Sequence, residues 1–151
     1  MRCDPEGIVE AAVTAYTLGD YETAAAYYAP DATFALYADN EISPFAGEWQ
    51  GRAAIVECWH KIGAAFDVIR FELRNIRNLD GHVTCQIDYE LRHIASGERL
   101  DGIARLILEV RDGQIVRERE YNDVERMRAF MRFAEYTGKT PVEVGGISAS
   151  G

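Results

Sequence analysis

Apolar residues recur every three or four positions in three segments of the N-terminal half. The first segment follows the pair Asp4-Pro5, which is typical of a helix start, and it ends at Gly19. A second, shorter segment covers residues 21–29 and stops at a proline, and a third covers residues 52–66. Because this spacing places apolar side chains on one face of a helix, the pattern predicts three amphipathic helices.

The period of the apolar pattern changes from 3.6 to 2 after residue 66. Residues 32–38 already have the composition of a strand, whereas residues 39–50, with Pro44 and Gly47, have that of a loop. Three later runs carry apolar residues on one side only: Ile69, Phe71 and Leu73; Val83, Cys85, Ile87, Tyr89 and Leu91; Leu100, Ala104, Leu106, Leu108 and Val110. Each run is therefore predicted to be a strand with one apolar face.

Three dipeptides that favour tight turns separate these runs. They are Asp80-Gly81, Ser96-Gly97 and Asp112-Gly113. Four long strands joined by three hairpins predict a curved antiparallel sheet, and its apolar face must be covered by the N-terminal helices. We therefore expect a single α+β domain over residues 1–137, closed by a helix over 124–136, with a flexible tail over 138–151.

Composition and charge exclude several classes of protein. The chain has 151 residues and a formal net charge of -9, without a cluster of Lys and Arg that could bind nucleic acid or an anionic membrane. No segment has the roughly 18 apolar residues of a membrane span, and the N-terminus lacks the apolar core of a secretory signal. We therefore expect a cytoplasmic protein with no nucleic-acid or membrane partner.

The metal-ligating residues are few and scattered. Three cysteines, Cys3, Cys58 and Cys85, are too far apart for a disulfide framework or a metal knuckle. The histidines at positions 60, 82 and 93 form no short ligand pair. We expect no metal and no cofactor.

The order of elements resembles the nuclear transport factor 2-like superfamily over residues 6–136. The resemblance rests on the segments Leu18-Gly19-Asp20-Tyr21, Tyr28-Ala29-Pro30-Asp31-Ala32-Thr33-Phe34, Trp49-Gln50-Gly51-Arg52-Ala53-Ala54-Ile55, Asp112-Gly113-Gln114-Ile115-Val116 and Glu120-Tyr121-Asn122-Asp123. It implies a cone-shaped roll enclosing an apolar cavity and a homodimer formed through the outer sheet face. Members include ketosteroid isomerases, limonene epoxide hydrolases and SnoaL-like polyketide cyclases.

The catalytic residues of two of these families are missing here. The carboxylate base, tyrosine and protonated aspartate of ketosteroid isomerases correspond to Leu36, Ala12 and Leu106. The first aspartate and the arginine of limonene epoxide hydrolases correspond to Tyr89 and Ile87, and the two residues that orient water to Phe34 and Leu36. Only the second aspartate has a counterpart, Glu120.

Glu120 is therefore the favoured catalytic residue. Strand parity predicts that Val116, Glu118, Glu120 and Asn122 face the cavity, with Glu120 as the only well-placed carboxylate. Tyr16 and Tyr89 are the candidate hydrogen-bond donors to a substrate oxygen. The residues expected to bind the ligand are Asn122, Trp59, Phe34, Leu36, Ile87, His93, Leu106 and Asp39.

Two functions remain open at this point. Glu120 would serve an isomerase, cyclase, dehydratase or hydrolase that acts on a small hydrophobic or polyketide-like molecule, because burial raises a carboxyl pKa toward values useful for proton transfer. Alternatively, the chain is a ligand-binding or accessory domain without chemistry. In that case residues 117–120, which alternate in charge, form a solvated or interface strand, and the tyrosines and tryptophans belong to the core.

Overall fold

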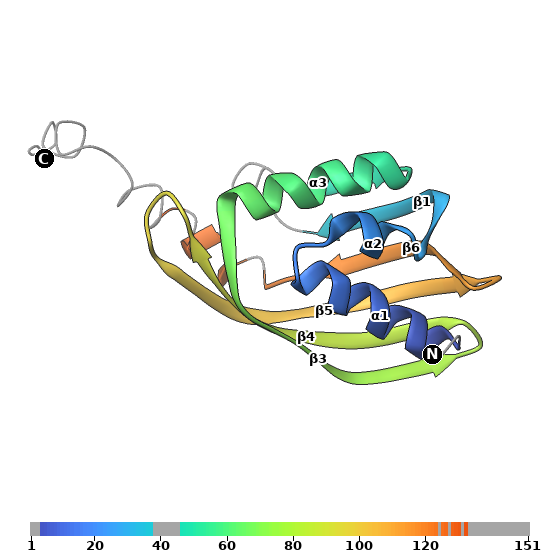
Figure 1. The fold of residues 1–151 in the computed structure, drawn as a ribbon. Coiled ribbons are helices and arrows are strands. Elements are labelled where there is room, and N and C mark those ends of the chain that lie inside the picture. The colour runs from blue at the N-terminus through green and yellow to red at the C-terminus, as the bar shows by residue number, and fades with distance from the viewer. Residues whose placement is uncertain (1–3, 38–45, 124, 127, 131, 133–151) are drawn as a thin grey trace, which may run out of the picture.

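The computed structural model describes residues 4–37, 46–123, 125, 126, 128–130 and 132. Among the described residues up to 121, three helices and six strands follow one another: α1 (Pro5–Thr17), α2 (Tyr21–Ala25), β1 (Tyr28–Tyr37), β2 (Gly47–Gln50), α3 (Arg52–Ala65), β3 (Phe66–Leu79), β4 (His82–His93), β5 (Arg99–Arg111) and β6 (Gln114–Tyr121). The helices cover one face of a curved, unclosed sheet (Figure 1), so the predicted α+β class is confirmed.

The six strands form one sheet in the order β2-β1-β6-β5-β4-β3. The four later strands pair antiparallel with their neighbours in sequence, as the hairpin signals predict. The sheet is nevertheless mixed and not purely antiparallel, because β1 pairs parallel to β6. This pairing joins residues about 80 positions apart, so no turn signal in the local sequence predicts it.

The second helix is shorter than predicted, and the first strand is correspondingly longer. The side chain of Asp20 accepts a hydrogen bond from the backbone N–H of Thr23 at 3.2 Å, and α2 ends at Ala25. Pro30 lies inside β1 and does not end a helix. The register between β1 and β6 shifts between Tyr28 and Thr33, so the missing N–H of proline falls where the ladder is irregular.

Residues 47–50, predicted as part of a loop, form the edge strand β2. The backbone N–H of Gly51 donates to the carbonyl of Ala32 at 2.7 Å, which brings this segment against β1. Gly51 has φ 92, a conformation that side chains other than glycine rarely adopt. The chain can therefore turn directly from β2 into α3.

Register shifts correct the predicted parity at two places. In β3 the register shifts between Val68 and Arg70, and Ile69, predicted on the apolar side, is 43% exposed. In β6 the extra residue is Val116, because Val110 pairs with Ile115 while Glu109 pairs with Arg117. Ile115, not predicted to face inward, is consequently fully buried.

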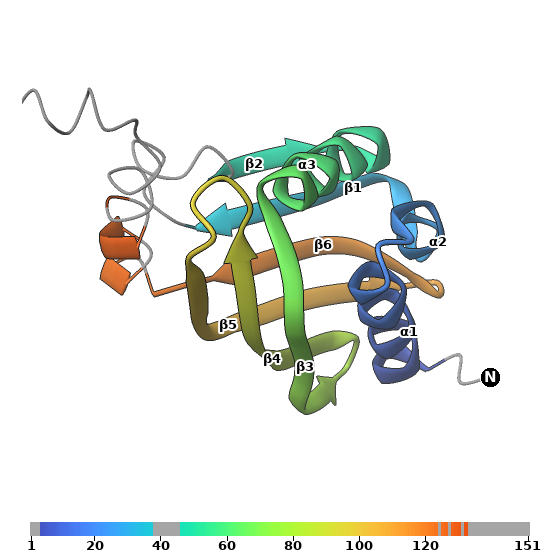
Figure 2. The same ribbon diagram turned by 60° about the vertical axis from the view of Figure 1, so that its left-hand side comes forward.

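The core lies between the helices and the covered face of the sheet (Figure 2). Its fully buried side chains come from both layers and include Val9, Phe34, Ile55, Cys58, Val83, Ile87, Leu108 and Ile115. Cys58 and Cys85 are buried free thiols, as expected for small apolar residues.

The described residues of the segment after β6, 125, 126, 128–130 and 132, are helical where the sequence predicts a closing helix. Arg126 fastens this segment to β5, because its Nε donates to the carbonyl of Asp101 at 2.7 Å. The predicted tail over 138–151 lies outside the described residues. Among the described helices, none has the length and apolar character needed to span a membrane.

Candidate functional site

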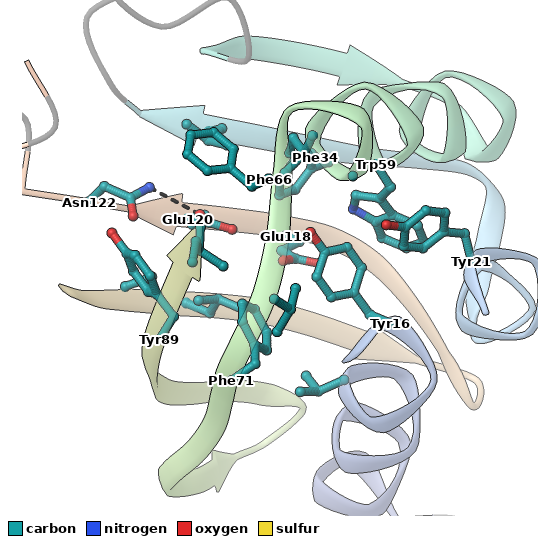
Figure 3. A pocket seen from close by; sticks show the side chains of 18 of the residues that line it. Tyr16, Tyr21, Phe34, Trp59, Phe66, Phe71, Tyr89, Glu118, Glu120 and Asn122 are labelled. Carbon is teal, nitrogen blue, oxygen red and sulfur yellow. Dashed lines mark hydrogen bonds between the residues drawn. The ribbon is translucent and has the colours of Figure 1, made fainter. Parts of the chain in front are cut away.

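A pocket of about 120 Å³ lies between the helices and the covered face of the sheet. Its walls are mostly apolar or aromatic and come from all three helices and from β1, β3, β4 and β5 (Figure 3). Its most polar side chains come from the last strand and the residue just after it: Glu118, Glu120 and Asn122. The pocket therefore combines an apolar enclosure with a strip of polar groups along one strand.

The two glutamates occupy this strip because of strand register. In the parallel pairing of β1 with β6, Phe34 stands opposite Glu118 and Leu36 opposite Glu120. On the other side, Leu108 of β5 pairs with Glu118, and Leu106 pairs with Glu120. Each carboxyl group therefore lies between two apolar side chains, which disfavours its charged form.

Glu118 is the more deeply buried of the two, with 6% of its surface exposed. Its Oε1 accepts a hydrogen bond from the hydroxyl of Tyr28. Burial raises the pKa of Glu118 from 4.5 to about 8; the bond from Tyr28 opposes this shift and the neighbouring Glu120 adds to it. At neutral pH the Glu118 carboxyl is therefore mainly protonated.

Glu120 is held by the residue two positions further on. The Nδ2 of Asn122 donates to its Oε2 at 3.0 Å (Figure 3). Burial raises the pKa of Glu120, and the hydrogen bond from Asn122 partly offsets this effect. A carboxylate that is oriented by an amide and partly desolvated is suited to accept a proton from a bound molecule.

Two tyrosines supply hydroxyl groups to the same pocket. Burial, together with the charge of Glu120, raises the pKa of Tyr16 well above 10 and that of Tyr89 to about 12. Both hydroxyls therefore stay protonated at neutral pH and can donate hydrogen bonds. In Figure 3 the hydroxyl of Tyr16 points toward Glu118, and that of Tyr89 toward Asn122.

Tyr89 owes its position to a glycine on the neighbouring strand. Gly102 pairs with Tyr89 across β4 and β5. A Cβ atom at position 102 would lie 2.8 Å from the Tyr89 hydroxyl oxygen and 3.0 Å from its Cζ. The tyrosine ring therefore fills the space that any larger residue at position 102 would need.

The Gly102→Ala variant should lower the free energy of unfolding by about 1–3 kcal/mol, because the added methyl overpacks the site. Urea denaturation measures this loss. The same substitution in a Tyr89→Leu background should cost much less, since the clashing ring atoms are gone. An equal cost in both backgrounds would show that Tyr89 is not the group displaced.

The structure brings together most of the residues predicted from sequence. The pocket lining includes Tyr16, Phe34, Leu36, Trp59, Tyr89, Leu106, Glu120 and Asn122. Ile87 is 1% exposed and belongs to the core beside the pocket, not to its lining. His93 also lies outside the lining; its Nδ1 is 2.8 Å from the hydroxyl oxygen of Ser96, and its ring contacts Phe66. Asp39 lies outside the described residues.

The expectation that Glu120 is the only well-placed carboxylate is wrong. Glu118 lines the same pocket and is bonded to Tyr28, which the sequence placed in the second helix. The parity of β6 predicts that Glu118 faces the pocket, but the alternating charges of the strand favoured the interpretation that this residue is solvated. Two further aromatic residues of the lining, Tyr21 and Phe66, were not predicted, whereas Phe71 lies on the strand face that the alternating pattern predicted to point inward.

The described residues show no group of three His, Cys, Asp or Glu side chains that could hold a metal ion. What the described lining offers is two carboxyl groups of raised pKa and four protonated tyrosine hydroxyls, of which that of Tyr28 is hydrogen-bonded to Glu118. These groups can exchange protons with a small molecule and can stabilise an oxygen that gains negative charge.

Comparisons with known proteins give a family and a fold. The model of the SnoaL-like domain family matches residues 9–118. A nuclear transport factor 2-like protein from Burkholderia thailandensis is 22% identical, covering 87% of this chain and 98% of that one, with a TM-score of 0.76. No curated protein sequence matches the chain significantly.

Two further solved structures are similar in fold. A candidate polyketide cyclase from Xanthomonas campestris is 21% identical over 84% of this chain and 96% of its own, with a TM-score of 0.70. TerC, co-crystallised with polyporic acid, is 18% identical over 87% of this chain and 99% of its own, with a TM-score of 0.76. At these identities the similarity establishes the architecture and leaves the chemistry to the site itself.

Proposed function

The chain belongs to the SnoaL-like domain family, and from that premise we propose that it binds a small, largely apolar molecule in its pocket and transfers a proton on it. In this proposal Glu120 is the general base. The observation that carries it is a half-buried carboxyl of raised pKa, oriented by Asn122 and flanked by apolar walls. Isomerisation, cyclisation and dehydration all begin with such a proton transfer.

The mechanism follows from the groups around Glu120. Removal of a proton from carbon beside a carbonyl leaves negative charge on the carbonyl oxygen, and that charge must be stabilised. The protonated hydroxyls of Tyr89 and Tyr16 line the same pocket as Glu120 and supply the hydrogen bonds. The apolar walls exclude water and strengthen these interactions.

A second candidate function is ligand binding without chemistry. Leu36 and Leu106, which flank Glu120 and line the pocket, occupy positions where ketosteroid isomerase-like enzymes carry catalytic groups. A pocket without those groups still binds apolar molecules. The two functions differ in one measurable property, namely whether a bound carbonyl compound exchanges protons.

Proton abstraction can be tested without knowing the natural substrate. Small cyclic ketones and enones incubated with the protein in D2O should exchange their α-hydrogens faster than in buffer, as NMR would record. The double variant Glu118→Gln/Glu120→Gln should reduce exchange to the buffer rate, because no carboxyl group is then left among the described residues that line the pocket. Binding of the ketones without any acceleration by the wild-type protein would favour the binding function.

The exposed Glu22 on α2 provides the matched control. The Glu22→Gln variant loses the same charge outside the pocket and should exchange the ketones at the wild-type rate. Loss of exchange in this variant would indicate a non-specific effect of charge and not a role for the pocket carboxyls.

A further inference from the structure

Within the described part of the chain, the pocket lining gives its two carboxyl groups no positively charged partner. Of the described residues that line it, none is Lys, Arg or His. Glu118 accepts its hydrogen bond from an uncharged tyrosine, and Glu120 accepts one from an uncharged amide. An acid as buried as Glu118, with a second acid two residues away and only uncharged hydrogen-bond donors, would gain from a positively charged partner whenever it ionises.

Among the described residues, the side chains that shift the pKa of Glu118 are acidic or neutral; basic groups act on its neighbours, Arg52 on the carbonyl of Tyr28 and Lys61 on Cys58. The titratable side chains that act on it or respond to its charge are Tyr16 from α1, Tyr28 from β1, Cys58 from α3, Cys85 from β4 and Glu120 from β6. Each of these side chains is neutral when protonated and negatively charged when deprotonated, so none of them carries a positive charge. The electrostatic potential at this end of the pocket therefore favours a positive ligand.

Aromatic rings gather at the same end of the pocket. Tyr28, which donates to Glu118, has its ring centroid 5.4 Å from that of Trp59. Tyr16 lies on the other side, with its centroid 5.5 Å from Trp59 and 5.4 Å from Tyr21. Figure 3 shows Tyr16, Tyr21 and Trp59 grouped beside Glu118. Faces of tyrosine and tryptophan rings attract cations as well as alkyl groups.

From these observations we propose that the Glu118 end of the pocket binds the ammonium group of a small protonated amine. The inference deepens the proposed function and rests on it for the placement of the ligand. Glu118 holds the charge of the ligand, Tyr28 and Trp59 flank it, and Glu120, with Tyr16 and Tyr89, remains available to act on the rest of the molecule. The two acids thus have separate tasks, recognition and proton transfer.

Three compounds that share one ring and differ in charge test this assignment: cyclohexylammonium, cyclohexanol and cyclohexanecarboxylate. Isothermal titration at pH 7 should show the amine binding at least about tenfold more tightly than the alcohol, because a charge-assisted bond replaces a neutral one. The carboxylate should not bind measurably. Equal affinity for amine and alcohol, or no binding of the amine at millimolar concentration, would overturn the proposal.

A second measurement needs no variant. The amine should stabilise the charged form of Glu118 and release its proton, so the binding enthalpy should depend on the ionisation enthalpy of the buffer. Binding of cyclohexanol should release no proton. Amine binding without proton release would contradict the role of Glu118.

The variants separate this inference from the proposed function. Glu118→Gln should remove the preference for the amine, whereas the surface control Glu22→Gln should keep it. Because these ligands are inert, the result does not depend on catalysis. If the wild-type protein prefers the amine but does not accelerate ketone exchange, amine binding at Glu118 is supported and proton transfer is excluded. If it accelerates ketone exchange but does not prefer the amine, proton transfer is supported and amine binding is excluded.

Discussion

The Glu118→Gln variant should be more stable than the wild-type protein at pH 9 and no more stable than it at pH 5. In the unfolded chain the carboxyl titrates near 4.5, whereas burial raises its pKa to about 8 in the folded protein. Between these values the folded state keeps a proton that the unfolded state has released. The free energy of unfolding therefore falls as pH rises through this interval, and the loss is complete above pH 8.

The size of this effect follows from the width of the interval. It covers about 3.5 pH units, the difference between 4.5 and about 8, each corresponding to ~1.4 kcal/mol, so the wild-type protein loses up to about 5 kcal/mol. Glutamine has no charge to bury, and its amide oxygen can still accept the hydrogen bond from Tyr28. Its amide N–H groups lack assured acceptors, which limits the gain to several kcal/mol.

Urea denaturation of both proteins at pH 5, 7 and 9 measures the difference directly. The curves of stability against pH should diverge above pH 5, with the variant the flatter of the two. Glu22→Gln removes an exposed carboxyl of the same kind and should follow the wild-type curve. Parallel curves for Glu118→Gln and the wild-type protein would mean that Glu118 is not buried as an acid.

The Glu120→Gln variant should lower the rate of ketone exchange by about 100-fold or more, as expected when a general base is lost. The substitution preserves shape and keeps an oxygen that can accept the bond from Asn122, so the pocket should still bind the ketone. The loss should therefore appear in the rate constant at saturation and leave the affinity nearly unchanged.

Glu118→Gln supplies the comparison within the same pocket. For a neutral ketone it should change the exchange rate by less than about tenfold, because recognition of positive charge is not needed. In the wild-type protein the rate should rise with pH through a midpoint above 4.5, since burial raises the pKa of Glu120. Equal losses of exchange rate in Glu118→Gln and Glu120→Gln would show that the two carboxyl groups act together in accepting the proton and that Glu120 does not act alone.

The alternating pattern was sufficient to predict the four long strands, because each has one covered and one exposed face. The same reasoning failed where a strand contains an extra residue. At Ile69 in β3 and Val116 in β6 the inserted residue changes which side chains face the core. Such register shifts depend on pairing with the neighbouring strand, which the sequence of one segment does not specify.

The candidate site could be predicted only in part for a related reason. Glu120 and Asn122 followed from parity, but the importance of Glu118 depends on Tyr28, which lies 90 positions away. The residues 24–29 contain several alanines and favour a helix locally, so Tyr28 was placed in the wrong element. The parallel pairing of β1 with β6 overrides that preference and brings the tyrosine beside the acid.

The position of β6 between β1 and β5 also has consequences while the chain is being made. A ribosome releases the helices, β1 and the first three strands of the meander before the strand that joins them exists. Until Gln114–Tyr121 emerges, β1 and β5 each present an unpaired edge, and such edges invite association between nascent chains. When β6 emerges it pairs with both edges and brings in Glu118 and Glu120. A chain cut short before residue 114 would thus lack its acids and leave its two halves unjoined.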